Sequence, residues 1–238
     1  MSSFVQGFLD NDSYFGKFMT KLGIIIGANL MFVVFSIPFF TMGAGLVALY
    51  HVMLKTLRGD GVLNPFSEFW RGFKNNFKQA TISWLIFVLA AGILYVDIRI
   101  CDQAGGMMSM MKYGAYAVGV ILIITFSFLL PTMAAFADSI PHLIRNSWFF
   151  FLRRPIQSVV ILFFDIFPLY LTYTDLTMRP LYAFLWTMLG FGAISMLGSA
   201  LLVKQFSEFL PSPEGDEAAD PSADEAGILE DMRKLDGF

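Results

Sequence analysis

Charged residues are scarce in this sequence. Asp, Glu, Lys and Arg make up 15% of its 238 residues, whereas a soluble domain carries roughly 25%. Hydrophobic residues reach 56%, and the 27 phenylalanines exceed what one soluble core of this length would hold. The mean hydropathy is +0.64. The shortage of charge therefore excludes an ordinary soluble domain and predicts an integral membrane protein.

Cysteine is nearly absent, and so are the common motifs of enzymes. The one cysteine, Cys101, excludes an internal disulfide and any multi-cysteine metal site. The sequence has no phosphate-binding loop, nucleophile elbow or HExxH motif, and no paired carboxylates at a useful spacing. We interpret His51 and His142 as interfacial hydrogen-bonding groups, because neither has an evident set of metal ligands beside it. We therefore expect no enzymatic activity, no cofactor and no metal.

Five apolar stretches are long enough, with their flanks, to approach the roughly 20 residues that a membrane-spanning helix needs. They predict an all-α polytopic transmembrane helical bundle, in which Pro38 and Pro131 kink the first and third spans. Six spans are the alternative, with a turn at Ser36–Gly43. The five stretches are Leu22–Leu49, Thr81–Tyr95, Tyr113–Ala137, Val159–Tyr173 and Leu181–Val203.

Loop charges predict the orientation of these spans. The segments 55–78 and 138–154 carry an excess of Lys and Arg, and we expect both on the cytoplasmic side. The balanced connectors near 97–112 and 174–179 are then external, and the C-terminus is cytoplasmic. Five spans place the N-terminus outside, which Lys17 and Lys21 oppose, whereas six spans place both ends inside.

The chain divides by composition into three parts. Residues 1–20 form an N-terminal segment, and residues 21–205 form the transmembrane helical domain. Residues 206–238 are rich in acidic residues and proline, with nine acidic and two basic side chains after position 210. Such a composition predicts a disordered, here cytoplasmic, tail.

An internal repeat is visible within the transmembrane domain. Residues 21–51 align without gaps to residues 112–142, with eight identical positions. A second block at a different offset pairs Trp70 with Trp148 and Asp97 with Asp175. These matches predict parallel repeats at 21–100 and 112–178, followed by a closing helix at 180–204. Chance similarity in a biased composition is the alternative.

The stretch "FWRGFKNNFKQATISW" (Phe69–Trp84) combines aromatic and basic residues. On a helix beginning at Asn64–Pro65, the aromatic residues from Phe66 to Phe77 fall on one side and most of the bases on the other. This pattern predicts a cytoplasmic helix lying in the membrane interface. Docking of a partner is the alternative, whereas nucleic-acid binding has no recognised motif to support it. The candidate docking residues are Phe69, Trp70, Arg71, Phe73, Lys74, Phe77, Lys78, Arg153 and Arg154.

A few polar and small residues interrupt the apolar spans. Asp165 lies near the middle of the fourth span, where an ionisable group costs roughly 2.5–3.5 kcal/mol and marks a candidate functional site. A protonated Asp that is hydrogen-bonded to Ser or Thr on a neighbouring helix is the alternative. Asn29 is a candidate polar neighbour of Asp165. Gly23 and Gly27 form a GxxxG motif that predicts close helix packing, and "GAG" at Gly43–Gly45 and "GFGA" at Gly190–Ala193 suit the same role.

Two stretches resemble the YesL family of bacterial membrane proteins. They are "PFFTMGAGLVALYHVMLKTLRGDG" (Pro38–Gly61) and "PFSEFWRGFKNNFKQATISWLI" (Pro65–Ile86), with the closest local match at Phe69–Ala80. The resemblance extends over most of residues 15–205. It implies a domain of unknown function, encoded beside carbohydrate ABC-transporter and glycan-degradation genes in Gram-positive bacteria. It provides no catalytic residues.

Two functional hypotheses follow. The first is a non-enzymatic accessory protein of the bacterial plasma membrane, associated with a carbohydrate ABC uptake system. The second is a small secondary transporter or channel that uses the intramembrane Asp165. The expected partners are the lipid bilayer and ABC permease subunits, with no nucleic acid; a homo-oligomer is left open.

Overall fold

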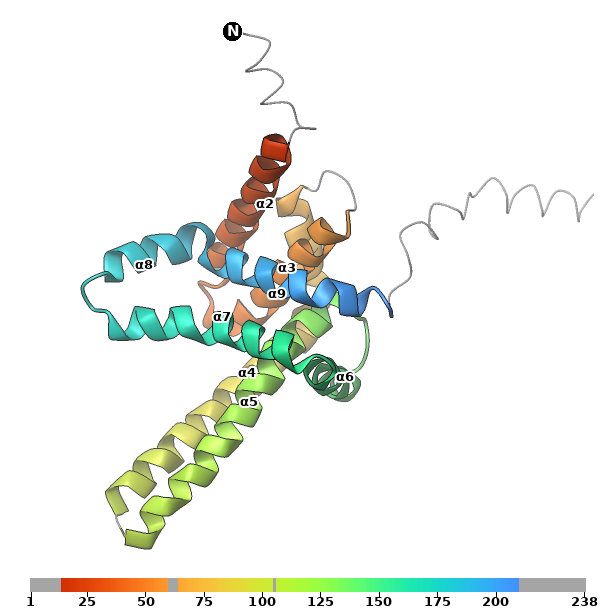
Figure 1. Ribbon diagram of the computed structural model, residues 1–238. Coiled ribbons are helices and arrows are strands. Elements are labelled where there is room, and N and C mark those ends of the chain that lie inside the picture. Colours follow the sequence, from red (N-terminus) through yellow and green to blue (C-terminus); the bar gives the residue numbers. More distant parts are fainter. Residues whose placement is uncertain (1–13, 60–63, 105, 210–238) are drawn as a thin grey trace, which may run out of the picture. The chain divides into compact units, whose positions relative to one another are not determined.

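A computed structural model describes residues 14–59, 64–104 and 106–209, and within these ranges the chain is helical without any strand (Figure 1). The described chain divides into two units after Val203, and α9 (Phe191–Phe206) runs across their boundary. The elements in chain order are α2 (Tyr14–Phe35), η1 (Phe39–Thr41), α3 (Met42–Arg58), α4 (Pro65–Ala104), η2 (Gly106–Met111), α5 (Lys112–Ala135), α6 (Ile140–Arg153), α7 (Pro155–Thr174), α8 (Arg179–Leu185), the π-helical turn η3 (Trp186–Gly190) and α9 (Phe191–Phe206).

Six helical segments in the described part of the chain are long and apolar enough to cross a membrane. This confirms the predicted helical bundle and four of its five spans, but the preference for five spans was wrong. The first predicted span, Leu22–Leu49, is two helices, α2 and α3. The six segments are Phe15–Phe35, Phe39–Arg58, Pro65–Ala104, Ser109–Ala135, Pro155–Thr174 and Arg179–Phe206.

The break between α2 and α3 is centred on Pro38 rather than being a kink within one helix. Pro38 has an extended backbone (φ −74°, ψ 110°) and no N–H to continue the helix. The buried Thr41 hydroxyl donates to the carbonyls of Phe35 and Pro38, and the Trp84 indole N–H donates to the Phe39 carbonyl at 2.9 Å. Because these side chains satisfy the freed carbonyls, the chain can turn sharply here.

Helix α3 lies at the centre of the packing and contacts α2, α4 and α5. Its closest approach is to the antiparallel α4, with a glycine on each helix. A Cβ added at Gly43 would meet the Trp84 side chain and lie 2.8 Å from the Ala80 carbonyl oxygen. A Cβ added at Gly72 would lie 2.9 Å from the Cβ of His51. The "GAG" motif therefore packs helices together, as predicted.

Helix α4 begins where the sequence predicts. The Asn64 side chain accepts the backbone N–H groups of Phe66 and Ser67, at 3.1 and 3.5 Å, and Pro65 follows in the first turn. The helix then continues for 40 residues without interruption, about 60 Å at 1.5 Å per residue. The predicted interfacial helix is therefore the first part of a longer helix that continues into the following span.

Helix α5 runs through Pro131 without a break, so the third predicted span is one helix. It contacts α4 along its length, and the two form the long hairpin in Figure 1. The stretches aligned in the proposed repeat consequently differ in structure. The first copy breaks at Pro38, whereas the second does not break at Pro131; conversely, α6 and α7 are two helices where the first copy has the single α4.

Large apolar side chains are exposed along the outer part of this hairpin and along α7. Ile86, Leu89 and Ile93 of α4 are 59%, 66% and 62% exposed. Backbone groups of these segments are satisfied within the helices, so an apolar exposed face suits contact with lipid. The predicted N-terminal segment up to residue 13 and the predicted acidic tail from residue 210 lie outside the described residues.

The α3–α4 contact leads to a first prediction. Gly43→Ala should destabilise the protein by about 1–3 kcal/mol, the usual cost of overpacking, because the new methyl group meets helix backbone. Thermal unfolding in detergent, followed by loss of helical circular dichroism, measures the effect.

Gly23→Ala provides the matched control, because a Cβ there meets nothing within 4 Å in the structure. It should leave the unfolding temperature unchanged or raise it slightly, since alanine favours a helix over glycine. Equal destabilisation by both variants would contradict the described packing.

Candidate functional site

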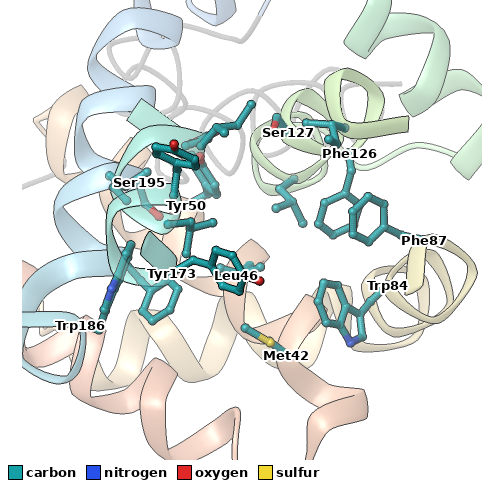
Figure 2. A pocket seen from close by; sticks show the side chains of 18 residues that line it. Met42, Leu46, Tyr50, Trp84, Phe87, Phe126, Ser127, Tyr173, Trp186 and Ser195 are labelled. Atoms are coloured by element: carbon teal, nitrogen blue, oxygen red, sulfur yellow. The ribbon is translucent and has the colours of Figure 1, made fainter. Parts of the chain in front are cut away.

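A cavity of about 620 Å³ lies among five helical segments. Its walls come from α3, α4, α5, α7 and the η3–α9 segment, and Figure 2 shows Trp84, Phe87 and Phe126 on one side and Trp186 and Ser195 on the other. Most of the lining is aromatic or aliphatic. The polar exceptions are one carboxyl group and a few hydroxyls, contributed by Asp165, Ser127, Ser195, Tyr50, Tyr170 and Tyr173.

Asp165, the one mid-span acid of α7, lines this cavity together with Ser127 of α5 and the buried Tyr50 of α3. The cavity lining contains no Lys, Arg or His. The arrangement provides one negative charge, hydroxyl groups and aromatic faces in an otherwise apolar space.

Asn29 does not serve as the neighbour of Asp165, in contrast to the sequence-based suggestion. Its side chain is completely buried and bonds to the last span. The amide nitrogen donates to the carbonyls of Trp186 and Thr187, at 3.0 and 2.7 Å, and the amide oxygen accepts the Gly192 N–H at 2.9 Å. These are backbone groups at the π-helical turn, where regular helical bonding is altered. Asn29 therefore stabilises an irregular turn.

That turn positions one wall of the cavity. The Trp186 indole N–H donates to the Thr172 hydroxyl of α7 at 2.9 Å, and its ring lies 4.6 Å from that of Phe191. Gly190 leaves room for the Trp186 ring, since an added Cβ would lie 2.6 Å from it. At Gly192, an added Cβ would lie 2.9 Å from the Ile25 carbonyl oxygen of α2. The "GFGA" motif therefore permits close packing, as predicted.

The candidate docking residues on α4 separate into two groups. Phe69 and Phe73 are buried, and both rings pack against that of Phe35, with centroids 5.8 and 5.0 Å away. They are therefore unavailable to a partner, which corrects the prediction. The other residues are exposed and fall within an arc of about 120° at 100° per residue. We name this group the basic ridge; it comprises Trp70, Arg71, Lys74, Phe77 and Lys78.

A cluster of charged side chains lies beneath the basic ridge. Glu68 accepts a hydrogen bond from Lys55 at 3.0 Å, and its other oxygen lies 3.6 Å from His51 Nε2 and 3.4 Å from Arg71. His51 also contacts the Ala134 carbonyl of α5 through Nδ1 at 3.5 Å. The cluster thus links α3, α4 and α5. Sequence reasoning missed the carboxylate beside His51, since Glu68 lies 17 positions further along the chain.

The second basic segment forms the separate amphipathic helix α6, which buries Leu143, Ser147 and Phe150 along one face. Before it, Asp138 accepts the Ser139 backbone N–H at 2.6 Å and contacts His142 at 3.1 Å. The Ser139 N–H, aided by His142, holds the pKa of the Asp138 carboxyl below its usual value although partial desolvation opposes this.

The two arginines predicted to dock a partner lie at the end of α6. Arg153 is exposed, with its guanidinium 5.8 Å from the Phe149 ring centroid, and Arg154 is partly exposed at the junction with α7. The structure thus places both outside the α4 segment that forms the basic ridge.

The remaining predicted residues have simple surroundings. Gly27 packs against Pro65 at the start of α4, at 3.1 Å from an added Cβ, whereas Gly23 is exposed. Only one glycine of the GxxxG motif therefore packs within the described chain. Cys101 is buried and free. No group of three or more His, Cys, Asp or Glu side chains in the described ranges is arranged to hold a metal ion.

These features define a multi-pass helical membrane protein with an acid-containing cavity. A family profile described as "Protein of unknown function, DUF624" matches residues 25–98, from α2 through most of α4. This match is consistent with the resemblance to the YesL family. No curated protein and no solved structure matches the chain.

The role of Asn29 leads to a second prediction. Asn29→Ala should lower the free energy of unfolding by about 1–3 kcal/mol, because buried carbonyls of the π-helical turn lose their donor. Asn76→Ala is the control, since the Asn76 amide nitrogen donates to the Gly72 carbonyl of its own helix, at 3.1 Å. Thermal unfolding in detergent compares them, and an Asn29→Ala loss no larger than that of Asn76→Ala would contradict the bridging role.

Proposed function

We propose that this chain is a non-enzymatic accessory or regulatory protein of the bacterial plasma membrane that associates with a carbohydrate ABC uptake system. The observation that carries the proposal is the basic ridge. Its bases and its two exposed aromatics, Trp70 and Phe77, are neighbours on α4. Beside them, Phe69 and Phe73 are buried against Phe35, whose ring also lies 5.6 Å from that of Trp70. A rigid helix thus presents cationic and aromatic groups, a combination common in protein interfaces.

The even number of spans supports a cytoplasmic position for this ridge. If all six candidate segments cross the membrane, α2 begins and α9 ends on the same side as the ridge. Lys17 and Lys21, the ridge and the basic segment around α6 then share one side, in agreement with the excess of positive charge on cytoplasmic loops. Such a ridge faces the nucleotide-binding side of an ABC system and suits an acidic surface on its partner.

The choice of partner rests on the YesL resemblance and its gene neighbourhood, which is an association and not a contact. The cationic ridge defines the chemistry that such a partner must provide: carboxylates around an apolar patch able to receive Trp70 and Phe77. Both side chains are substantially exposed, at 50% and 38%.

Charge reversal tests this proposal. With a carbohydrate ABC permease pair co-expressed and purified in mild detergent, the double variant Lys74→Glu, Lys78→Glu should recover about tenfold less permease than the unchanged chain, since paired charges at interfaces commonly contribute more than 1.4 kcal/mol. Quantitative immunoblotting of the eluate provides the measurement.

The matched control is Lys17→Glu, Lys21→Glu on α2, which reverses two exposed charges on the same expected side of the membrane. Recovery with the control should equal that of the unchanged chain. The proposal fails if the folded, unchanged chain retains no permease, or if both double variants reduce recovery equally.

A second candidate function, a small secondary transporter or channel, is favoured by the cavity that contains Asp165. In proteoliposomes, a flux driven by an ion or proton gradient should be present in the unchanged chain and lost in Asp165→Asn. Asp97→Asn, at an exposed position outside the cavity lining, should leave the flux intact. Absence of flux for any sugar, ion or proton gradient would remove this candidate.

A further inference from the structure

We propose that the cavity among α3, α4, α5, α7 and α9 binds a lipophilic monocation, meaning a mainly apolar molecule that carries one ammonium-like positive charge. The proposal uses the same cavity as the transport candidate but requires binding alone. It is independent of the basic ridge, none of whose residues lines the cavity.

The charge of the cavity lining favours a cationic ligand. Asp165 is the one acidic residue that lines the cavity, and no cationic side chain lines it. Among the ion pairs of the described residues none includes Asp165. A carboxylate within a membrane span is costly unless it finds a countercharge. A bound cation provides that countercharge, whereas an anionic ligand adds a second unpaired negative charge.

The aromatic lining also favours a cation, because cations bind favourably over aromatic faces, most strongly over tryptophan. On one side the Trp84 and Phe87 rings both pack against Phe126, with centroid distances of 5.7 and 4.1 Å. On the other side Trp186 lies beside Phe191. Figure 2 shows Trp84 and Trp186 facing the cavity from opposite sides.

Both tryptophan rings are held in place before any ligand arrives. The Trp84 indole N–H bonds to the Phe39 carbonyl and the Trp186 indole N–H to the Thr172 hydroxyl, each at 2.9 Å. Because the N–H groups are already engaged, each ring keeps its orientation in the cavity wall. Such preorganisation reduces the entropic cost of binding.

The size and low polarity of the cavity favour a small, mainly apolar ligand. A space of about 620 Å³ lies within the range of roughly 300–1,000 Å³ that accommodates small organic ligands. A sugar of that size would need many hydrogen-bonding groups, and the lining offers only one carboxyl group and a few hydroxyls. A lipophilic cation satisfies its one charge at Asp165 and leaves its apolar body against the aromatic walls.

The test uses tetraphenylphosphonium as the probe, with tetraphenylborate as a ligand of the same shape and opposite charge. Equilibrium dialysis of the purified full chain in detergent measures both, and quenching of tryptophan fluorescence provides a second readout. We expect saturable binding of the cation at one site per chain, and binding of the anion weaker by about tenfold or more. Equal binding of the two, or no saturable binding of the cation, would overturn the proposal.

Variants locate the site. Asp165→Asn preserves the shape of the side chain and should weaken cation binding by about tenfold or more, whereas Asp97→Asn should leave it unchanged. Unchanged binding in Asp165→Asn would overturn the proposal. If Asp165→Asn fails to fold, Asp165→Glu, which keeps the charge, should still bind the cation. The preference of the unchanged chain for the cation over the anion then decides whether the proposal stands.

The outcomes also separate this proposal from the proposed functions. Binding of the cation without any flux in proteoliposomes leaves this proposal standing and removes the transport candidate. Loss of permease recovery in the charge-reversed ridge, with cation binding intact, shows that the two sites act separately.

Discussion

The close contact between α3 and α4 is the constraint on which the rest of the structure depends. Gly43 and Gly72 lie at two levels of the same antiparallel pair, and at both levels a side chain would collide with the facing helix. Their absence of side chains lets Trp84 reach over the start of α3 and bond to Phe39. At the other end of the pair, the same approach brings Glu68 to Lys55 and His51. One geometric requirement therefore fixes both the turn after α2 and the charged cluster.

Two interruptions in otherwise regular helices create the cavity. The turn at 36–41 directs α3 inward, and the π-helical turn at 186–190 directs Trp186 toward α7. Both are stabilised by side-chain hydrogen bonds: from Thr41 within the turn and from the distant Trp84 at the first, and from Asn29 at the second. Because these bonds satisfy backbone carbonyls of the irregular turns, the membrane does not penalise them heavily. The positions of Trp84 and Trp186 on opposite sides of the cavity are consequently set by these two turns.

Composition and apolar length were sufficient to predict the helical bundle, and the Asn64–Pro65 signal located the start of α4. The number of spans was not accessible in the same way. A proline in an apolar run predicts either a kink or a turn, and the outcome at Pro38 depends on Thr41 and on the distant Trp84. Pro131 has no such break and stays inside α5. Likewise, a helical wheel placed Phe69 and Phe73 with Trp70, but only α2 determines which of these aromatics are covered.

The candidate site was partly accessible from the sequence. Asp165 stands out as a carboxyl group within an apolar run, and it does line a cavity. Asn29 stands out for the same reason, yet it binds the backbone of the last span, 157 residues away. A single polar residue in a span signals that a partner exists, without indicating which. The aromatic walls gave no signal, since phenylalanine and tryptophan are abundant throughout the chain.

The account depends most on the claim that the chain leaves the membrane between α2 and α3. In a Cys101→Ser background, single cysteines at Ile37, Leu176 and Lys74 can be labelled with a membrane-impermeant thiol reagent in intact cells. We predict labelling of Ile37→Cys and Leu176→Cys from outside, and labelling of Lys74→Cys only after the cells are opened. Protection of Ile37→Cys under both conditions, as expected of a kink within one span, would contradict the account.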